Sequence, residues 1–282
     1  MVTGASGAVG RMLIPLLRER GSEVRAVVRR REAAEGLRGM GAKAAVCRLG
    51  DADALEAVMQ GVHTVVHLAG GLELPDDAAY EESNHSTARW VLEAAEEAGA
   101  TRFLFMSYPG AAPDSPNAYL RAKGAAEEDI RASGLQHAIV RSTHVYGPRC
   151  RWLEEMRAAA SRPVAVVVGD GTQRVAPAFV RDVARVLTAA DDRAHPVAGT
   201  FGLQGPDAVS VDELIDLLAG RPKRKVHLGP RAAARSARVF GRRLSPALAD
   251  ILARDSLADA PDAAVEFGIE LTSLPDGLRA TP

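Results

Sequence analysis

Short apolar runs alternate with longer amphipathic stretches through the first 150 residues of the chain. The stretch 11–20 carries apolar residues at Met12, Leu13 and Leu16, the spacing of one helix face, and Gly21 is placed to end that helix. The same alternation predicts strands at 23–29, 43–49, 63–69, 101–107 and 136–141, and helices at 11–20, 31–40, 52–60, 82–98 and 116–133. It favours an α/β fold, a doubly wound parallel sheet covered by helices on both faces.

The pattern changes after Tyr146, where helical segments outnumber strands. We expect strands at 163–168 and 200–203 and helices at 182–190, at 211–219 and within 232–257. These elements indicate a smaller, mostly helical C-terminal lobe over residues 149–282, set against a first domain of residues 1–148. Because no low-complexity linker separates the two, we expect them to interleave in one compact body.

Composition narrows the class of protein without choosing a function. The 282 residues carry 35 basic and 36 acidic side chains, and 47% are hydrophobic. This near-neutral balance argues against binding of nucleic acid or an anionic membrane through bulk charge. No apolar run reaches the roughly 18 residues that a membrane span needs. Two cysteines, Cys47 and Cys150, form no disulfide framework and suit a reducing compartment, so we expect a cytoplasmic protein.

Three glycines stand at G-x-x-G-x-x-G spacing within residues 4–10, directly before the first predicted helix. Glycines in this context permit a tight turn, close approach of the backbone to a pyrophosphate, and packing of the helix on the sheet. The helix N-terminus then offers free N–H groups to the phosphates. A plain turn is the alternative. We expect a dinucleotide-binding loop of the Rossmann type, with these contact residues: Gly4, Ser6, Gly7, Ala8, Val9 and Gly10.

The strand before this loop is unusually short in the sequence. Only three residues precede Gly4, whereas a central parallel strand needs about five. We therefore expect either a start assigned too late or a shortened first strand. Mass spectrometry of the native protein would distinguish the two.

The end of the second predicted strand indicates which dinucleotide the loop would prefer. An acidic residue there binds the ribose 2′-hydroxyl of NAD, whereas arginine suits the 2′-phosphate of NADP. The chain has Arg29 and Arg30 there and no acid before Glu32, which favours NADP(H) over NAD(H); a solvated basic turn is the alternative. Asp51, after the third predicted strand, is placed either to meet the adenine amino group or to cap the next helix.

Tyr119 and Lys123 are four residues apart in the helix predicted at 116–133, for which Ser115 is the expected N-cap. At this spacing both side chains project from one face. A lysine ammonium beside a phenol lowers the phenol pKa from its usual value near 10, which would make a usable base near neutral pH. The chain has only four tyrosines and four lysines, so a chance pair at this spacing is rare.

The glycine loop and Tyr119-x-x-x-Lys123 together resemble the short-chain dehydrogenase/reductase superfamily. Further segments resemble its extended and atypical branch, of the NAD-dependent epimerase/dehydratase type: HLAG at 67–70, Asn84, RSTHVYGP at 141–148, GDGTQR at 169–174 and FVRDVA at 179–184. The resemblance implies that Ala69, Gly70 and Asn84 lie on the nicotinamide side and that Tyr146 faces cofactor and substrate. The first domain would then be an NAD(P)-binding Rossmann domain and the second a substrate lobe.

The resemblance also implies catalytic roles. Lys123 would hold the nicotinamide ribose hydroxyls, and Tyr119 would exchange a proton as hydride moves. A third residue, Ser or Thr at the end of the fifth strand, would orient the substrate oxygen. This chain has Ser107-Tyr108 where the family has two small hydroxyl residues. Either Ser107 or Tyr108 replaces the usual serine, or the triad is degraded.

We therefore expect an NAD(P)-dependent oxidoreductase or epimerase/dehydratase that acts on a small carbonyl or alcohol, with a nucleotide-linked sugar as one candidate. The alternative, motivated by Tyr108, is a non-catalytic NADP(H)-binding sensor or assembly subunit on the same fold. We expect a small-molecule substrate and no partner nucleic acid, membrane or metal ion, and the resemblance allows a homodimer. His63 and His67, on one predicted strand without an acidic partner, are expected to be core or edge residues.

Overall fold

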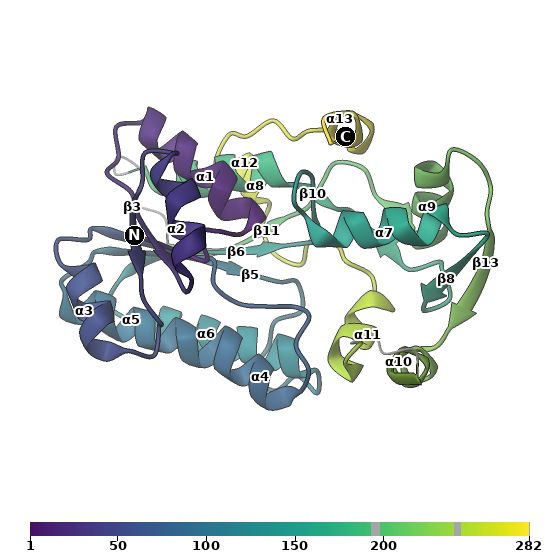
Figure 1. Cartoon of the computed structure of the whole chain (residues 1–282), viewed down its shortest axis with the longest axis horizontal. Coiled ribbons are helices and arrows are strands. Elements are labelled where there is room, and N and C mark those ends of the chain that lie inside the picture. Colours follow the sequence, from purple (N-terminus) through teal and green to yellow (C-terminus); the bar gives the residue numbers. More distant parts are fainter. Residues whose placement is uncertain (193–197, 240–243, 282) are drawn as a thin grey trace.

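The computed structural model describes residues 1–192, 198–239 and 244–281, and its centre is a seven-stranded parallel sheet (Figure 1). The strand order is β11-β6-β5-β4-β1-β2-β3, and every neighbouring pair is parallel. The strands are β1 (Val2–Thr3), β2 (Arg25–Val28), β3 (Lys43–Val46), β4 (Thr64–His67), β5 (Arg102–Ser107), β6 (Gln136–Ser142) and β11 (Gly199–Leu203). This order is that of a Rossmann sheet, so the predicted doubly wound fold is confirmed.

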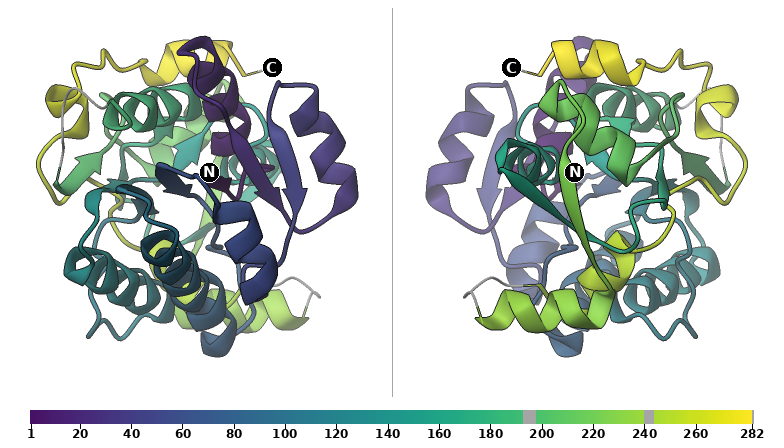
Figure 2. Two further views of the ribbon diagram at one scale, coloured as in Figure 1. Left: turned by 90° about the vertical axis from the view of Figure 1, so that its left-hand side faces the viewer. Right: turned by 90° about the vertical axis from the view of Figure 1, so that its right-hand side faces the viewer.

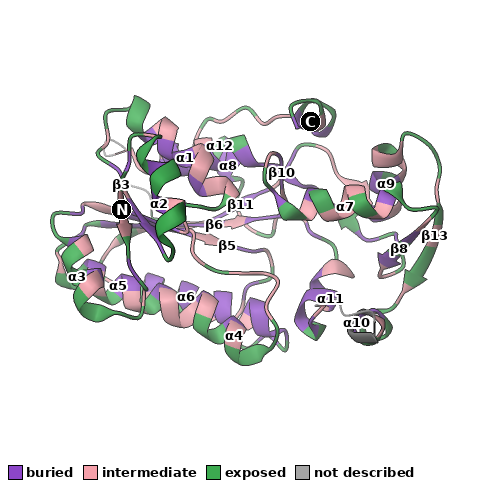
Figure 3. Cartoon of the chain, viewed as in Figure 1, coloured by how far each residue is buried: buried purple, intermediate pink, exposed green. Residues whose placement is uncertain are grey.

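Helices cover both faces of the sheet (Figures 1 and 2). On one face lie α1 (Ala8–Glu19), α2 (Arg31–Arg38) and α8 (Val180–Ala190), and on the other α3 (Ala52–Met59), α5 (Thr87–Glu97) and α6 (Ala118–Ala132). Successive residues of β5 enter different cores: Leu104 packs in the first, whereas Phe103 and Phe105 pack in the second, and all three are fully buried. Burial of the central strands on both sides (Figure 3) explains their continuous apolar runs.

Several helix boundaries differ from those predicted, and two of the differences have a clear cause. The helix expected at 82–98 begins at Asp77, because the Asp76 side chain accepts a 2.9 Å hydrogen bond from the Ala79 N–H, and it contains a π-helical turn. This continuous segment consists of α4 (Asp77–Glu81), η1 (Glu82–Ser86) and α5. Ser115 was expected to cap α6, and this is wrong. The Asn117 side chain accepts from the first N–H groups of the helix, which delays its start.

The chain after residue 148 forms the lobe beside the sheet and also contributes α8 and β11 to the core layers. The lobe contains α7 (Arg151–Ser161), β8 (Val164–Val168), α9 (Val211–Ala219), β13 (Arg224–Leu228), α10 (Pro230–Val239), α11 (Pro246–Leu252) and α13 (Leu274–Arg279). Helix α12 (Ala263–Glu266) lies instead against β11, and its Ala263 packs in the same core as α1 and α8. Three two-stranded pairs complete the lobe: β7 (Val145–Tyr146) with β10 (Ala178–Phe179), β9 (Arg174–Val175) with β12 (Val209–Ser210), and β8 with β13. Among the described residues, no helix is long and apolar enough to cross a membrane.

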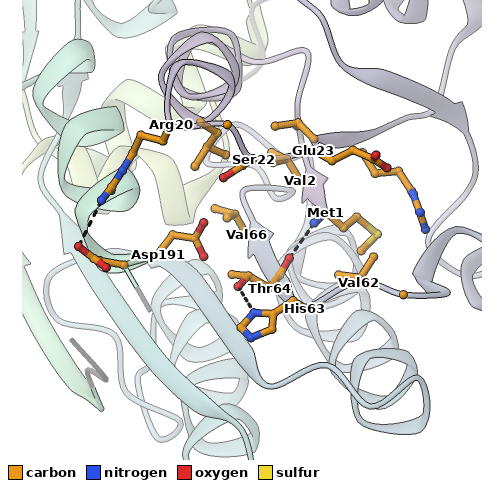
Figure 4. A pocket seen from close by; sticks show the side chains of 16 residues that line it. Met1, Val2, Arg20, Ser22, Glu23, Val62, His63, Thr64, Val66 and Asp191 are labelled. Carbon is orange, nitrogen blue, oxygen red and sulfur yellow. Dashed lines mark hydrogen bonds and ion pairs between the residues drawn. The ribbon is translucent and has the colours of Figure 1, made fainter. Parts of the chain in front are cut away.

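A cavity of about 700 Å³ opens at the amino ends of β1, β2 and β4 (Figure 4). The Met1 ammonium lies in it and donates a 2.7 Å hydrogen bond to the Thr64 carbonyl, and burial lowers the pKa of that ammonium to about 5. Arg20, Glu23 and Asp191 also line the cavity. Ligands of doubly wound sheets bind at the opposite edge, outside the carboxyl ends of the strands. The candidate site therefore lies at the carboxyl ends of the strands.

Candidate active site

The loop between β1 and α1 leaves the N-terminus of α1 open. Gly4 has a φ of +62°, and a Cβ there would lie 2.6 Å from the Leu68 carbonyl. A Cβ on Gly10 would lie 2.6 Å from the Ala5 carbonyl oxygen, so packing requires glycine at both positions. Gly7 caps α1 without a side-chain hydrogen bond, and the first turn holds no acidic residue. The first N–H groups of α1 are therefore free for an anion, and the loop fits a pyrophosphate.

The remaining predicted residues of this half of the site lie at the same edge. Ser6 is exposed, and Ala8 and Val9 are half-buried in the first turn of α1. Arg29 and Arg30 are exposed directly after β2, and their contact with a ribose phosphate stays a prediction. The Asp51 carboxylate accepts a 3.2 Å hydrogen bond from the Ala54 N–H, which confirms its capping role in α3. Its contact with adenine stays a prediction.

The loop after β4 brings three predicted residues together. Gly70 has a φ of +149°, and a Cβ there would lie 2.7 Å from Asn84 Oδ1 and 3.4 Å from Lys123 Nζ. The buried Asn84 side chain donates to the Gly71 carbonyl and accepts from the Gly71 N–H, both at 3.0 Å. Asn84 thus positions the backbone that follows Ala69. Its place in the π-helical turn η1 fits the frequent use of such turns at functional sites.

Lys123 lies beneath the loop that follows β4, at the end of β5. Its ammonium donates a 2.9 Å hydrogen bond to the Met106 carbonyl and lies 4.6 Å from the centre of the Phe105 ring. Burial lowers the pKa of Lys123 to about 8. The ammonium keeps two further N–H donors, which can reach the hydroxyls of a bound ribose.

Tyr119, one turn before Lys123 on α6, is buried between two other tyrosines. Its ring meets Tyr80 edge-on at 6.0 Å and Tyr108 edge-on at 5.6 Å, measured between ring centres. We expected Lys123 to lower the pKa of Tyr119, and in this structure the shift has the opposite sign. Burial, followed by the neighbouring tyrosines, raises the Tyr119 pKa far above its usual value. The phenol is therefore protonated at neutral pH, and burial makes it a weaker acid than a tyrosine in water.

The hydroxyls of Ser107 and Tyr108 both have partners within the protein. Ser107 donates a 2.6 Å hydrogen bond to the buried Glu127 carboxylate. The Tyr108 hydroxyl lies 2.9 Å from Ser256 Oγ and 3.3 Å from His144 Nε2. The Ser107 hydroxyl proton is therefore committed to Glu127, and the Tyr108 hydroxyl lies within hydrogen-bond distance of two protein partners. Ser256 was not predicted from the sequence, because it comes from a distant segment that carries no motif. His144 does lie within a segment that the sequence singled out, RSTHVYGP at 141–148.

Glu127 organises the buried polar network behind this site. Its carboxylate accepts hydrogen bonds from the Ser107 hydroxyl and from the guanidinium groups of Arg131 and Arg141. The two bonds from Arg141 measure 2.9 Å from its Nε and 2.7 Å from a terminal nitrogen. Arg141 also binds the Asp259 carboxylate at 2.9 Å and thereby ties the C-terminal segment to β6. The positions 119, 123 and 127 share one face of α6. This face therefore carries the phenol, the ammonium and the carboxylate that fixes β5 and β6.

Tyr146 belongs to a buried cluster against which Ala8 and Val9 of the first turn of α1 also pack. Its side chain is fully buried, and its hydroxyl donates a 3.2 Å hydrogen bond to the Ser273 carbonyl. The ring packs against Phe179, and a Cβ on Gly277 of α13 would collide with its hydroxyl. In this structure Tyr146 therefore anchors the C-terminal segment. Its contact with a cofactor stays a prediction.

This arrangement agrees with a comparison against known protein families. A family model described as NAD(P)H-binding matches residues 4–190, well over half of the chain. The chain belongs to this NAD(P)H-binding family. The match spans the glycine loop, Asn84 and the Tyr119–Lys123 pair, and it confirms NAD(P) as the class of cofactor.

Relatives of this NAD(P)H-binding protein have several named roles. It is 31% identical over 225 residues to NADH dehydrogenase [ubiquinone] 1 alpha subcomplex subunit 9 of Arabidopsis thaliana mitochondria, covering 77% of this chain and 56% of that protein. It is 33% identical over 189 residues to the ceramide reductase of Caulobacter vibrioides, covering 67% and 59%. The chain thus spans less than two thirds of either relative's length. Citrobacter triphenylmethane reductase, solved with NADP(H), shares the fold, with a TM-score of 0.80 and 18% identity over 100% of this chain and 99% of that one.

Two buried histidines should make the stability of this NAD(P)H-binding protein fall in acid. Burial lowers the pKa of His67 to about 3 and that of His144 to about 4. The unfolded chain binds protons on both near pH 6.5, so their contribution is complete above that pH and is lost progressively below it. We expect the free energy of unfolding to decrease by about 1.4 kcal/mol per pH unit for each histidine between roughly pH 6 and 4.5.

Urea denaturation at several pH values tests this expectation. His144→Phe keeps an aromatic ring against Trp152, whose stacked ring centre lies 4.8 Å from that of His144. This variant lacks the His144 imidazole, so the part of the pH dependence of its unfolding free energy that the two histidines cause should fall by about half. An unchanged pH dependence in the variant would contradict the assignment.

Proposed function

We propose that this protein is an NADP(H)-dependent reductase in which Tyr119 donates a proton to a carbonyl oxygen. The observation that carries the proposal is the position of Tyr119, a buried phenol one helical turn before Lys123 on α6. It lies on the helix whose Lys123 approaches Gly70 and Asn84, at the edge of the sheet where dinucleotides bind. NADPH supplies the hydride when bound.

The protein's own residues prepare the proton transfer. The α1 N-terminus binds the pyrophosphate, and Lys123 holds the ribose hydroxyls with the N–H groups that Met106 leaves free. Tyr119 hydrogen-bonds the carbonyl oxygen and gives up its proton as negative charge develops there. The Lys123 ammonium stabilises the phenolate that results, at a stage when burial alone would oppose it.

Transfer of isotope from the cofactor tests this function. Protein incubated with NADPH deuterated at nicotinamide C4 and with a panel of aldehydes and ketones should yield alcohols that carry deuterium at the former carbonyl carbon. Absence of deuterated alcohol from every member of the panel, with NADPH binding demonstrated, would contradict the function. It would favour the second candidate described below.

The preference for NADP(H) rests on Arg29 and Arg30. Their exposed guanidinium groups follow β2, and no acidic residue stands there to bind the 2′-hydroxyl of NAD. Replacing both by alanine should weaken NADPH binding by about 10- to 100-fold, the value of one charge-assisted interaction, and leave NADH binding within about threefold. Fluorescence titration with each nucleotide measures this. Arg89→Ala, on the exposed side of α5, is the matched control, and an equal loss for both nucleotides would contradict the assignment.

A second candidate function is supported by Ser107 and Tyr108. Both hydroxyls have hydrogen-bond partners within the protein, which is expected if the catalytic triad has lost its serine. One relative is a named subunit of NADH dehydrogenase. On this reading the protein binds NADP(H) as a sensor or assembly subunit and transfers no hydride. It predicts NADPH binding together with a stable protein partner, and no Tyr119-dependent turnover.

A further inference from the structure

A wall of aromatic rings leads from Tyr119 into the lobe. The Tyr119 ring meets Tyr108 at 5.6 Å, Tyr108 meets His144 at 5.7 Å, and His144 stacks on Trp152 at 4.8 Å, all between ring centres. The four rings come from α6, the end of β5, the segment after β6, and α7. A substrate held at the Tyr119 hydroxyl is therefore bordered on the lobe side by aromatic carbon.

This wall ends at a small cavity between α7, β8, α9 and α11. The cavity measures about 60 Å³, and its lining includes His144, Trp152, Met156, Val167, Ile215 and Leu252. Its lining residues include no arginine, lysine or carboxylate. Leu252 follows Ile251 of α11, which packs in the same cluster as Tyr108 and Tyr119. His144, which lines the cavity, is also the ring that contacts Tyr108, so the wall of rings links the cavity to the surroundings of Tyr119.

The cavity borders an exposed apolar face of the pair formed by β8 and β13. Val166 and Val226 are direct partners in this pair and remain 45% and 44% exposed. Val168 and Leu228, two residues further along, are also partners and lie on the same face. Val166 and Val168 line the cavity as well. Apolar surface left in contact with water next to a cavity indicates a place for an apolar ligand.

We propose that the substrate is a carbonyl compound with an apolar arm, and that the arm occupies this cavity and lies along the Val166–Val226 face. The proposal rests on the reductase function proposed above and names its substrate class. The carbonyl carbon gains hydride from NADPH, the oxygen gains the Tyr119 proton, and the products are an alcohol and NADP+. A nucleotide-linked sugar fits this wall poorly, because its diphosphate finds no cation in the lining.

A chain-length series tests the proposal through turnover. With NADPH and straight-chain aldehydes from propanal to octanal, kcat/KM should rise by about fourfold per methylene that enters the cavity. Val166→Glu places a carboxylate on the apolar face without entering the core, and it should lower kcat/KM for octanal at least tenfold while leaving propanal and NADPH affinity unchanged. Val265→Glu, at a valine 79% exposed on α12, is the matched control and should change nothing.

Binding without turnover separates this inference from the proposed function. The chain contains two tryptophans, so Trp90→Phe leaves Trp152 as the only indole reporter. Octanol should shift the Trp152 fluorescence and saturate at a concentration far below that of butanol, and Val166→Glu should abolish this difference even if no aldehyde is reduced. Equal binding of octanol and butanol, or a response to UDP-glucose that exceeds the response to octanol, would overturn the proposal.

Discussion

Replacing Tyr119 with phenylalanine is expected to lower the rate of carbonyl reduction by about 10²- to 10⁴-fold, the usual contribution of a positioned proton donor. The substitution removes one oxygen and keeps the ring, so the edge contacts with Tyr80 and Tyr108 persist. The affinity for NADPH should stay within about threefold, because the Lys123 ammonium and the α1 N-terminus are untouched. Single-turnover oxidation of NADPH, followed by its absorbance, measures the rate.

Tyr80→Phe is the matched control for this variant. The Tyr80 hydroxyl donates to the Leu72 carbonyl and contacts Ser245, so it serves the packing around the site and is not placed to donate a proton to substrate. The control should lose some stability and keep most of its rate. If Tyr119→Phe reduces carbonyls at the original rate, another group donates the proton, and Tyr108 is the nearest phenol.

Replacing Glu127 with alanine is expected to lower the free energy of unfolding by about 3–5 kcal/mol. The carboxylate is fully buried and receives hydrogen bonds from Ser107, Arg131 and Arg141. Without it, the half-buried Arg141 retains only Asp259 and the Ala111 carbonyl, and the Ser107 hydroxyl loses its acceptor. Urea denaturation near neutral pH measures the loss.

Two further variants serve as controls for the loss of stability in Glu127→Ala. Glu128→Ala alters the exposed neighbour of Glu127 on the same helix and should change stability by less than about 0.5 kcal/mol. Glu127→Gln keeps the shape and one acceptor oxygen, and it should fall between the wild type and the alanine variant. A Glu127→Ala protein as stable as the Glu128→Ala control would show that Arg141 finds other partners and that the network does not hold β5 and β6 together.

The sequence predicted the order of the core elements and the class of cofactor, whereas the individual cofactor contacts stay predictions. Alternation of apolar runs sufficed for the sheet because its strands are buried on both faces. The requirements at Gly4 and Gly10 were also predictable, since both follow from a tight turn before a packed helix. The placement of Tyr119 and Lys123 one turn apart on α6 followed from helical spacing alone.

The features that the sequence did not predict depend on contacts between distant segments. The raised pKa of Tyr119 arises from burial beside Tyr80 and Tyr108, which approach it from different elements. Strand β13 was not predicted, because only Val226 and Leu228 of its five residues are apolar, and it forms where β8 pairs with it along its whole length. Ser256 reaches Tyr108 from 148 positions away in the chain, so no local motif marked it.

The most direct test of the central claim is a crystal structure of the protein with NADP+. We expect the pyrophosphate at the N-terminus of α1 and the nicotinamide ribose hydroxyls about 2.7–3.2 Å from Lys123 Nζ and the Tyr119 hydroxyl. The nicotinamide ring should then lie beside Tyr119, on the side of the aromatic wall. A dinucleotide bound elsewhere, or one whose nicotinamide lies beyond the reach of Tyr119, would contradict the assignment of this site to hydride transfer.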